Sequence, residues 1–187
     1  MGVGMPNRLI RTRCARPYTE HLEHIRETYV WDSANSVSSH NDPIPRNILF
    51  DGVRLWLIDW ESAYRNDPLV DAAIMLDNFA PSPELAGVLL KAWLGRAPDE
   101  AFFEQLAPAR ALTRLYYAGV LLSASAAASG PISDDDLSAP ILPEFQQAVQ
   151  EGRIKPGTPA TKHILGKMFL NSFLTNVSPP GLEDAVK

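Results

Sequence analysis

Long apolar runs are missing from this 187-residue chain, and so is nearly all cysteine. The best candidate for a membrane span, residues 112–128, contains Arg114 and is diluted by Ser123 and Ser125, so we expect no membrane-spanning helix. The single cysteine, Cys14, excludes an internal disulfide and a cage of several thiolates around a metal. Such cysteine usage is typical of a reduced, intracellular protein, and we expect the chain in the cytoplasm.

Positive charge is also scarce. Seventeen Lys and Arg residues stand against 22 Asp and Glu residues, and the net charge of -5 is unsuited to neutralising a nucleic-acid backbone. A hydrophobic content of 45% is enough for one ordinary core. We therefore expect one domain whose partner is a small molecule, with neither nucleic acid nor membrane as a partner.

Apolar periodicity predicts a mainly α-helical domain with one small β-hairpin. Residues 48–50 and 53–58 are apolar runs joined by Asp51-Gly52, which is typical of a two-residue hairpin turn that pairs Phe50 with Val53. Apolar residues at helical spacing, with proline or glycine at the breaks, predict the other elements. The expected helices cover residues 17–31, 71–79, 82–94, 99–106, 109–128, 143–150 and 160–174.

Four polar residues around the hairpin form a pattern suited to phosphoryl transfer. That reaction needs a carboxylate to orient and deprotonate the acceptor hydroxyl, and oxygen ligands to hold Mg²⁺ on the phosphates of a nucleotide. Asp42 can serve as the base and His40 as a brace for the loop. Asn47 and Asp59 can serve as metal ligands, because the hairpin brings both to its open end. Since a strict ladder would put these two ligands on opposite faces, Asn47 has to belong to the loop.

The same stretch resembles the aminoglycoside phosphotransferase and choline kinase family, whose members share a protein-kinase-like fold. Three motifs match in order between Ser39 and Ala73. They are His40-x-Asp42-x4-Asn47, Leu57-Ile58-Asp59-Trp60-Glu61 and Asn66-Asp67-Pro68-x2-Asp71-x-Ala73. Three motifs at the right separations are a far more specific signal than a lone H-x-D.

The resemblance implies a kinase that transfers phosphate from ATP. Asp42 would be its general base, and Asn47 and Asp59 would bind Mg²⁺. Asp71 would anchor the catalytic loop. The Asn66-Asp67 pair, with Trp60-Glu61, is closer to the choline and ethanolamine kinase branch, and the implied acceptor is a hydroxyl of a small amino alcohol or amino sugar.

One family feature has no counterpart in this sequence. Members place a nucleotide-binding lobe before the catalytic loop, whereas 39 residues precede His40, and no lysine precedes Lys91. The resemblance therefore covers the helical carboxyl-terminal lobe alone, expected over residues 17–175, with a poorly ordered N-terminus at 1–16 and a tail at 176–187. The catalytic loop and hairpin would occupy residues 39–60, and the helical part residues 68–175.

A truncated or divergent product, or a chain completed by a lobe from elsewhere, would fit this pattern. We expect such a chain to bind MgATP weakly, because contacts to the phosphates are lost. We also expect self-association through the exposed inner face of the lobe.

On the substrate side, Glu61 and Tyr64 follow Asp59 closely, together with Trp60. Aromatic side chains can wall a cage for a quaternary ammonium group, or can pack in the core or at its rim. The aromatic candidates are Trp31, Trp60, Tyr64, Trp93, Tyr116 and Tyr117.

Ordinary structural roles remain open for the polar residues. Asp42 could belong to a turn before Pro43, and Asn47 and Asp59 could be polar hairpin ends. Asp67 could cap the following helix, and Asp71 could be an acid in its first turn.

Two further functions also remain open. One is a catalytically silent remnant or substrate-binding module of the same fold. The other is a metal-dependent phosphohydrolase that uses His40, Asp42 and Asp59, for which the remaining histidines show no matching spacing.

Overall fold

The computed structural model describes residues 16–29, 32–130 and 136–175. Within these ranges the chain is mainly helical, as expected, and it contains two small antiparallel sheets where one hairpin was expected. The helices are α1 (Arg16–Thr28), α2 (Pro68–Phe79), α3 (Pro83–Leu94), α4 (Glu100–Ser129), α5 (Leu142–Gln150) and α6 (Pro159–Leu174). The expected disorder at residues 1–15 and the tail at 176–187 lie outside the described residues. Arg16 is already helical.

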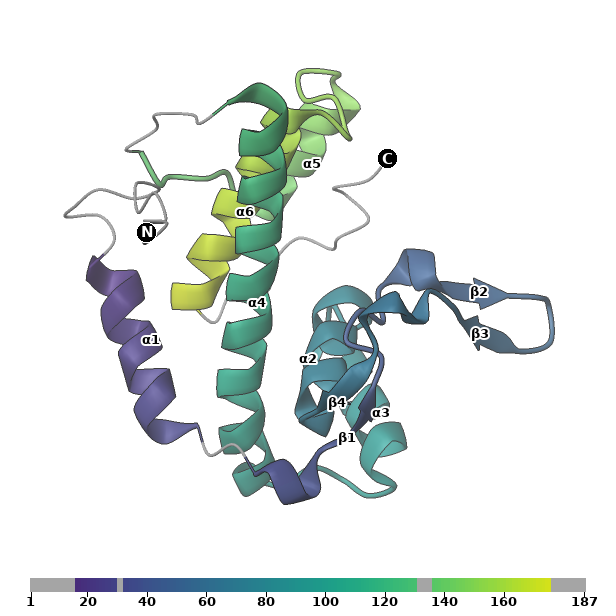
Figure 1. Cartoon of the computed structure of the whole chain (residues 1–187). Coiled ribbons are helices and arrows are strands. Elements are labelled where there is room, and N and C mark those ends of the chain that lie inside the picture. The colour runs from purple at the N-terminus through teal and green to yellow at the C-terminus, as the bar shows by residue number, and fades with distance from the viewer. Residues whose placement is uncertain (1–15, 30–31, 131–135, 176–187) are drawn as a thin grey trace, which may run out of the picture.

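The long helix α4 runs beside α6 through the middle of the molecule (Figure 1). The main core lies between them and includes Leu121 of α4, Phe169 of α6, Phe145 of α5 and Ile74 of α2. Gly166 permits the close approach, because a Cβ added there would lie 2.7 Å from the Cγ of Leu122 on α4. The two helices therefore pack nearly backbone to backbone at this point.

The expectation of two helices at 99–106 and 109–128 is wrong, because α4 is continuous through Pro108. A proline inside a helix removes one backbone hydrogen bond and crowds the preceding turn. Leu106 and Ala109, on either side of Pro108, are both buried, so packing holds the helix together across this position.

Two other helix boundaries differ from expectation by more than one residue. α2 begins at Pro68 and not at residue 71, because Asp67 caps it through Leu69 N–H and proline suits the first helical position. α1 ends at Thr28 and not at Trp31, and residues 30 and 31 lie outside the described part of the chain.

The first sheet is the expected hairpin, but its turn is longer than predicted. Strand β2 (Ile48–Phe50) pairs with β3 (Leu55–Leu57), and Phe50 lies opposite Leu55. The expected pairing of Phe50 with Val53 is therefore wrong. Asp51 accounts for the four-residue turn, because its carboxylate accepts hydrogen bonds from the backbone of Val53 and Arg54 and from the indole of Trp56.

The second sheet was not expected from the sequence. It pairs β1 (Val37–Ser39) with β4 (Tyr64–Asn66), so that the segment before the catalytic loop lies beside the segment after Asp59. Each strand has three residues and little apolar alternation, which explains why periodicity did not reveal it. Figure 1 shows this pair beside α2, while the β2–β3 hairpin extends away from the helices.

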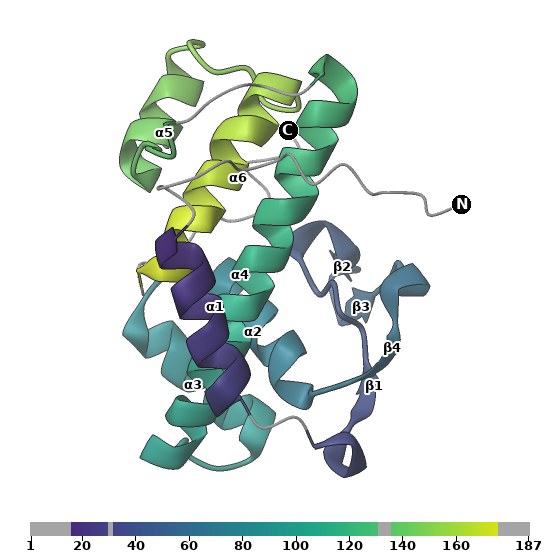
Figure 2. The same cartoon turned by 60° about the vertical axis from the view of Figure 1, so that its left-hand side comes forward.

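Two further sets of contacts hold the helices together. Arg110 and Arg114 of α4 both pair with Asp77 of α2, and Arg114 also donates to the backbone carbonyl of Ser172 on α6. On the near side in Figure 2, α1 packs on the end of α6, where Tyr18 stacks with Phe173. Of the helices that the structure describes, none has the length and apolarity needed to cross a bilayer.

Candidate active site

The candidate catalytic loop starts where β1 ends and is held by one buried carboxylate. Asp71, in the first turn of α2, accepts hydrogen bonds from the backbone N–H of His40 at 2.8 Å and of Asn41 at 2.7 Å. Hydrogen bonds to a charged acceptor are stronger than neutral ones. The N-terminal turn of α2 thus fixes the backbone just before Asp42.

Asn41 is a site residue that the sequence did not reveal. It has a left-handed backbone conformation with φ of 64°, which Asn tolerates better than most residues. Its side-chain amide donates to the carbonyls of Ser39 and Ser62 and accepts from Asn66 at 2.6 Å. The side chain therefore ties the loop to β4 and to the turn that precedes it.

Asp42 follows, and both oxygens of its carboxylate are hydrogen bonded. Oδ1 accepts from the hydroxyl of Tyr117 on α4 at 2.9 Å, and Oδ2 accepts from Nδ2 of Asn47 at 3.0 Å. Arg46 lies 3.5 Å from Oδ2, with more than half of its side chain exposed. Ile44, two residues after Asp42, is buried in the main core and so anchors the loop to the helices.

His40 braces the loop against the hairpin. Its Nε2 donates to the carbonyl of Ile58 at 2.8 Å, since a carbonyl can only accept, and its Nδ1 accepts from the backbone N–H of Asp42 at 3.3 Å. The ring meets Trp60 edge to face, with centroids 4.7 Å apart. Both ring nitrogens and the contact with Trp60 thus hold the imidazole in position.

Asn47 and Asp59 lie at the open end of the hairpin. The sequence predicted that Asn47 lies outside the strand, and it does: it belongs to a short 3₁₀ turn (Pro45–Asn47). Its backbone carbonyl accepts a hydrogen bond from the backbone N–H of Ile58 at 2.9 Å. Ile58 therefore lies opposite Asn47, and Asp59 is the next residue in the chain. Asp59 is exposed and has a left-handed backbone, with φ of 62°.

This donor set fits Mg²⁺. Mg²⁺ prefers oxygen ligands, keeps several waters and needs only one or two protein ligands beside substrate phosphates. Both protons that Asn47 donates go to Asp42, to its carbonyl and its carboxylate, which leaves the amide oxygen for another partner. The part of the chain that the structure describes holds no group of three or more His, Cys, Asp or Glu residues suited to a metal.

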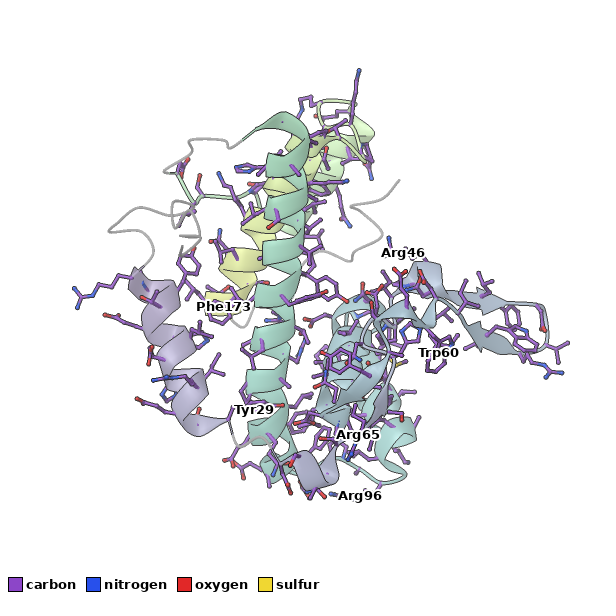
Figure 3. All side chains as sticks on the ribbon, viewed as in Figure 1. Tyr29, Arg46, Trp60, Arg65, Arg96 and Phe173 are labelled. Carbon is purple, nitrogen blue, oxygen red and sulfur yellow. The ribbon has the colours of Figure 1, made fainter. Side chains whose placement is uncertain are left out.

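Of the substrate-side candidates, Trp60 and Glu61 follow the hairpin directly, whereas Tyr64 lies on β4. Trp60 and Glu61 lie in a 3₁₀ turn (Trp60–Ser62), and Figure 3 shows Trp60 at the base of the hairpin. The Trp60 indole donates to the carbonyl of Leu57 at 2.9 Å. Tyr64, on β4, is exposed, and its hydroxyl accepts from the Asn66 amide at 3.3 Å.

The remaining aromatic candidates lie on other elements. Trp93 is on α3 and Tyr116 on α4, and both are exposed, while Tyr117 is buried. Among the described rings, Tyr116 contacts Tyr117 and Trp60 contacts His40. The sixth candidate, Trp31, lies outside the described residues.

Asp67 has a structural role on α2. Its Oδ1 caps the helix at Leu69 N–H, and its Oδ2 accepts from the hydroxyl of Tyr29 at 2.5 Å. Burial, and then this carboxylate, raise the pKa of Tyr29. The contact joins the end of α1 to the start of α2 beside the catalytic loop.

Comparisons with known proteins match the segment that contains these residues. The family described as the phosphotransferase enzyme family matches residues 12–106, which include the whole segment from His40 to Asp71. Protein LicA of Haemophilus influenzae is 43% identical over 54 residues, which make up 29% of this chain and 20% of that protein. A second LicA sequence from the same species is 43% identical over 54 residues, or 16% of its length. The matched segment is thus a fifth or less of these curated relatives, and no solved structure matches the chain.

Proposed function

Since the chain belongs to the phosphotransferase enzyme family, we propose that it serves an ATP-dependent kinase reaction on a hydroxyl of a small amino alcohol or amino sugar. The observation that supports this most directly is the Asp42 carboxylate. Hydrogen bonds from Asn47 and from Tyr117 of α4 hold it, and the hairpin that follows Asn47 returns the chain to Asp59, the second proposed oxygen ligand for the metal. Phosphoryl transfer requires this combination of a fixed carboxylate and oxygen ligands for a metal.

Asp42 orients the acceptor hydroxyl and takes up its proton. The hydroxyl oxygen forms a bond to the γ-phosphorus of ATP, the bond from that phosphorus to the β–γ bridging oxygen breaks, and ADP leaves. Mg²⁺, when bound, would be held by Asn47 and Asp59 and would neutralise charge on the phosphates. His40, Asn41 and Asp71 keep the loop in place through the hydrogen bonds described above.

A cationic acceptor suits the groups next to Asp59. Glu61 offers an exposed carboxylate, and the exposed rings of Trp60 and Tyr64 can face an ammonium group. These three residues are our proposed substrate contacts. The single cysteine supports a place in the cytoplasm, where thiols stay reduced.

The exposed hairpin favours one alternative, a substrate-binding module that works only with a partner. Phe50 is 67% exposed and Leu55 is 69% exposed, although both are large apolar residues. We propose that another copy or chain covers this surface, and that the uncovered chain binds MgATP weakly. A phosphohydrolase is not proposed, because the described residues lack the metal cluster that it needs.

Transfer of label from γ-labelled ATP to a panel of choline, ethanolamine and amino sugars tests the function. We expect labelled product with an amino-alcohol or amino-sugar acceptor. Glu61→Gln should raise the KM for the cationic acceptor, whereas the matched control Glu104→Gln, an exposed acid on α4, should not. Substrate binding without transfer at any ATP concentration would favour the binding module. Phosphate release from monoesters without nucleotide would contradict both functions.

A further inference from the structure

Tyr117 contacts the proposed base from a part of α4 that lies beyond the family match. It lies on α4, outside the matched residues 12–106, and is separated from Asp42 by 75 positions. Its hydroxyl nevertheless donates to Asp42 Oδ1 at 2.9 Å. The contact joins the catalytic loop directly to the central helix of the fold.

Core packing fixes where this hydroxyl lies. Tyr117 is 8% exposed and belongs to the main core together with Ile44 of the catalytic loop. Its ring lies 5.8 Å from the ring of Phe169 on α6 and 5.5 Å from that of Tyr116, measured between centroids. The hydroxyl is therefore held from a packed position, unlike a donor on a surface side chain.

The phenol acts only as a donor here. Burial and the charge of Asp42 raise the pKa of Tyr117, so it stays protonated through the neutral range. A carboxylate can rotate about its Cβ–Cγ bond unless both oxygens are held. Tyr117 holds Oδ1, and Asn47 holds Oδ2, which Arg46 also approaches, so Oδ1 keeps a second lone pair for the acceptor hydroxyl.

We propose that Tyr117 is a positioning residue of the phosphotransferase site, whose hydroxyl sets the rotation of the Asp42 carboxylate toward the acceptor hydroxyl. The proposal rests on the proposed function, because it takes Asp42 as the base. Arg46 is a poorer candidate for this role, since its guanidinium is largely exposed and lies 3.5 Å from Oδ2.

The test uses Tyr117→Phe in the full chain, which removes the hydroxyl and keeps the ring in the core. With the acceptor identified by the panel, kcat should fall about tenfold, the factor for one net hydrogen bond, while the KM for MgATP stays unchanged. The ¹³Cγ resonance of Asp42, assigned by its loss in Asp42→Asn, should move in Tyr117→Phe. Tyr116→Phe is the matched control, because Tyr116 is the neighbouring tyrosine and is 63% exposed. It should change neither quantity.

The proposal requires both the fall in kcat and the movement of the Asp42 resonance in Tyr117→Phe. A Tyr117→Phe chain with the wild-type kcat, or with an unmoved Asp42 resonance, overturns the proposal, as does an equal effect of Tyr116→Phe. If the wild-type chain transfers no phosphate to any acceptor, the proposed function fails on its own. The resonance then decides alone: movement in Tyr117→Phe supports control of the carboxylate, and no movement overturns it.

Discussion

Two buried backbone N–H groups, those of His40 and Asn41, depend on the carboxylate of Asp71. A buried donor that loses its acceptor costs about 1–3 kcal/mol. The left-handed backbone of Asn41 adds conformational strain that the surrounding contacts must offset. Asp71 therefore contributes to stability and to the shape of the loop in the same contact.

Asp71→Asn should lower the free energy of unfolding by about 1–3 kcal/mol, because its amide can accept only one of the two hydrogen bonds. The matched control is Glu84→Gln, another acid in the first turn of a helix, but an exposed one. An acid that acts only on the helix dipole is worth about 0.3–1 kcal/mol. Urea unfolding of both variants measures the difference. Equal losses would reduce Asp71 to an ordinary first-turn acid.

Two tyrosines that donate to carboxylates, the buried Tyr117 and the half-buried Tyr29, predict a loss of stability in alkali. Tyr117 and Tyr29 have a raised pKa in the folded chain, so their stabilisation is complete below about pH 10, the usual tyrosine pKa. Above that pH the unfolded chain loses protons that the folded chain keeps, and stability falls as the pH rises. For Tyr117 the slope approaches about 1.4 kcal/mol per pH unit.

Urea unfolding between pH 8 and pH 11 checks this expectation. Tyr117→Phe should flatten the alkaline slope, whereas the exposed Tyr116→Phe should leave it nearly unchanged. A wild-type stability that stays constant to pH 11 would contradict the account of Tyr117 as a buried donor.

The sequence pointed to polar residues that belong to a motif, including Asp71, which contacts the loop as expected, and it missed contacts that no motif marks. Asp42, Asn47 and Asp59 stand out because their chemistry and spacing fit one motif. Asn41 looked like an ordinary loop residue, and its left-handed backbone has no signal in one sequence. Tyr117 was suggested as a cage wall or a core residue and not as a partner of Asp42, because no periodicity relates α4 to a loop 75 positions away.

At the scale of elements, the pattern predicted which segments are helical better than where they stop. Pro108 suggested a break, yet burial on both sides of it keeps α4 whole. Asp51-Gly52 predicted the hairpin correctly and its register wrongly, because hydrogen bonds from Val53 and Arg54 to Asp51 favour a longer turn. These hydrogen bonds decide the turn, and composition alone does not show them.

The contact between α4 and α6 predicts that replacing two helical glycines by alanine has opposite effects on stability. Gly166→Ala should destabilise the chain by about 1–3 kcal/mol, since its Cβ would meet the side chain of Leu122 at 2.7 Å and its backbone nitrogen at 3.2 Å. Gly119→Ala on α4 is the control. Nothing lies within 4 Å of the added Cβ, and helix propensity should stabilise this variant by up to about 1 kcal/mol. Thermal unfolding that shows the same sign for both variants would contradict the close packing.

For the molecule as a whole, the helices enclose a core while the β2–β3 hairpin stays outside it (Figure 1). Exposed apolar residues lie on both faces of this two-stranded sheet, because neighbours along a strand point to opposite sides. These residues are Leu49, Phe50, Val53, Leu55 and Trp56. Apolar patches of this kind mark contacts with other chains.

We expect the isolated chain to self-associate at micromolar concentrations through this surface. Phe50→Thr combined with Leu55→Thr should shift it toward monomer in sedimentation velocity, since both changes remove exposed apolar surface, while threonine, being β-branched, still suits a strand. Val88→Thr, which alters an equally exposed apolar residue on α3, serves as the control and should leave association unchanged. A wild-type chain that is monomeric at all concentrations would remove the case for a partner at the hairpin.

The central claim is that Asp42 serves phosphoryl transfer, and a single-turnover experiment tests it most directly. Chain in excess over γ-labelled MgATP is mixed with the amino-alcohol or amino-sugar acceptor and quenched over time, so that even slow transfer is counted. We predict labelled acceptor with the wild-type chain and a rate at least about a hundredfold lower with Asp42→Asn, the usual share of a general base. Equal rates of product formation by the two chains would contradict the claim.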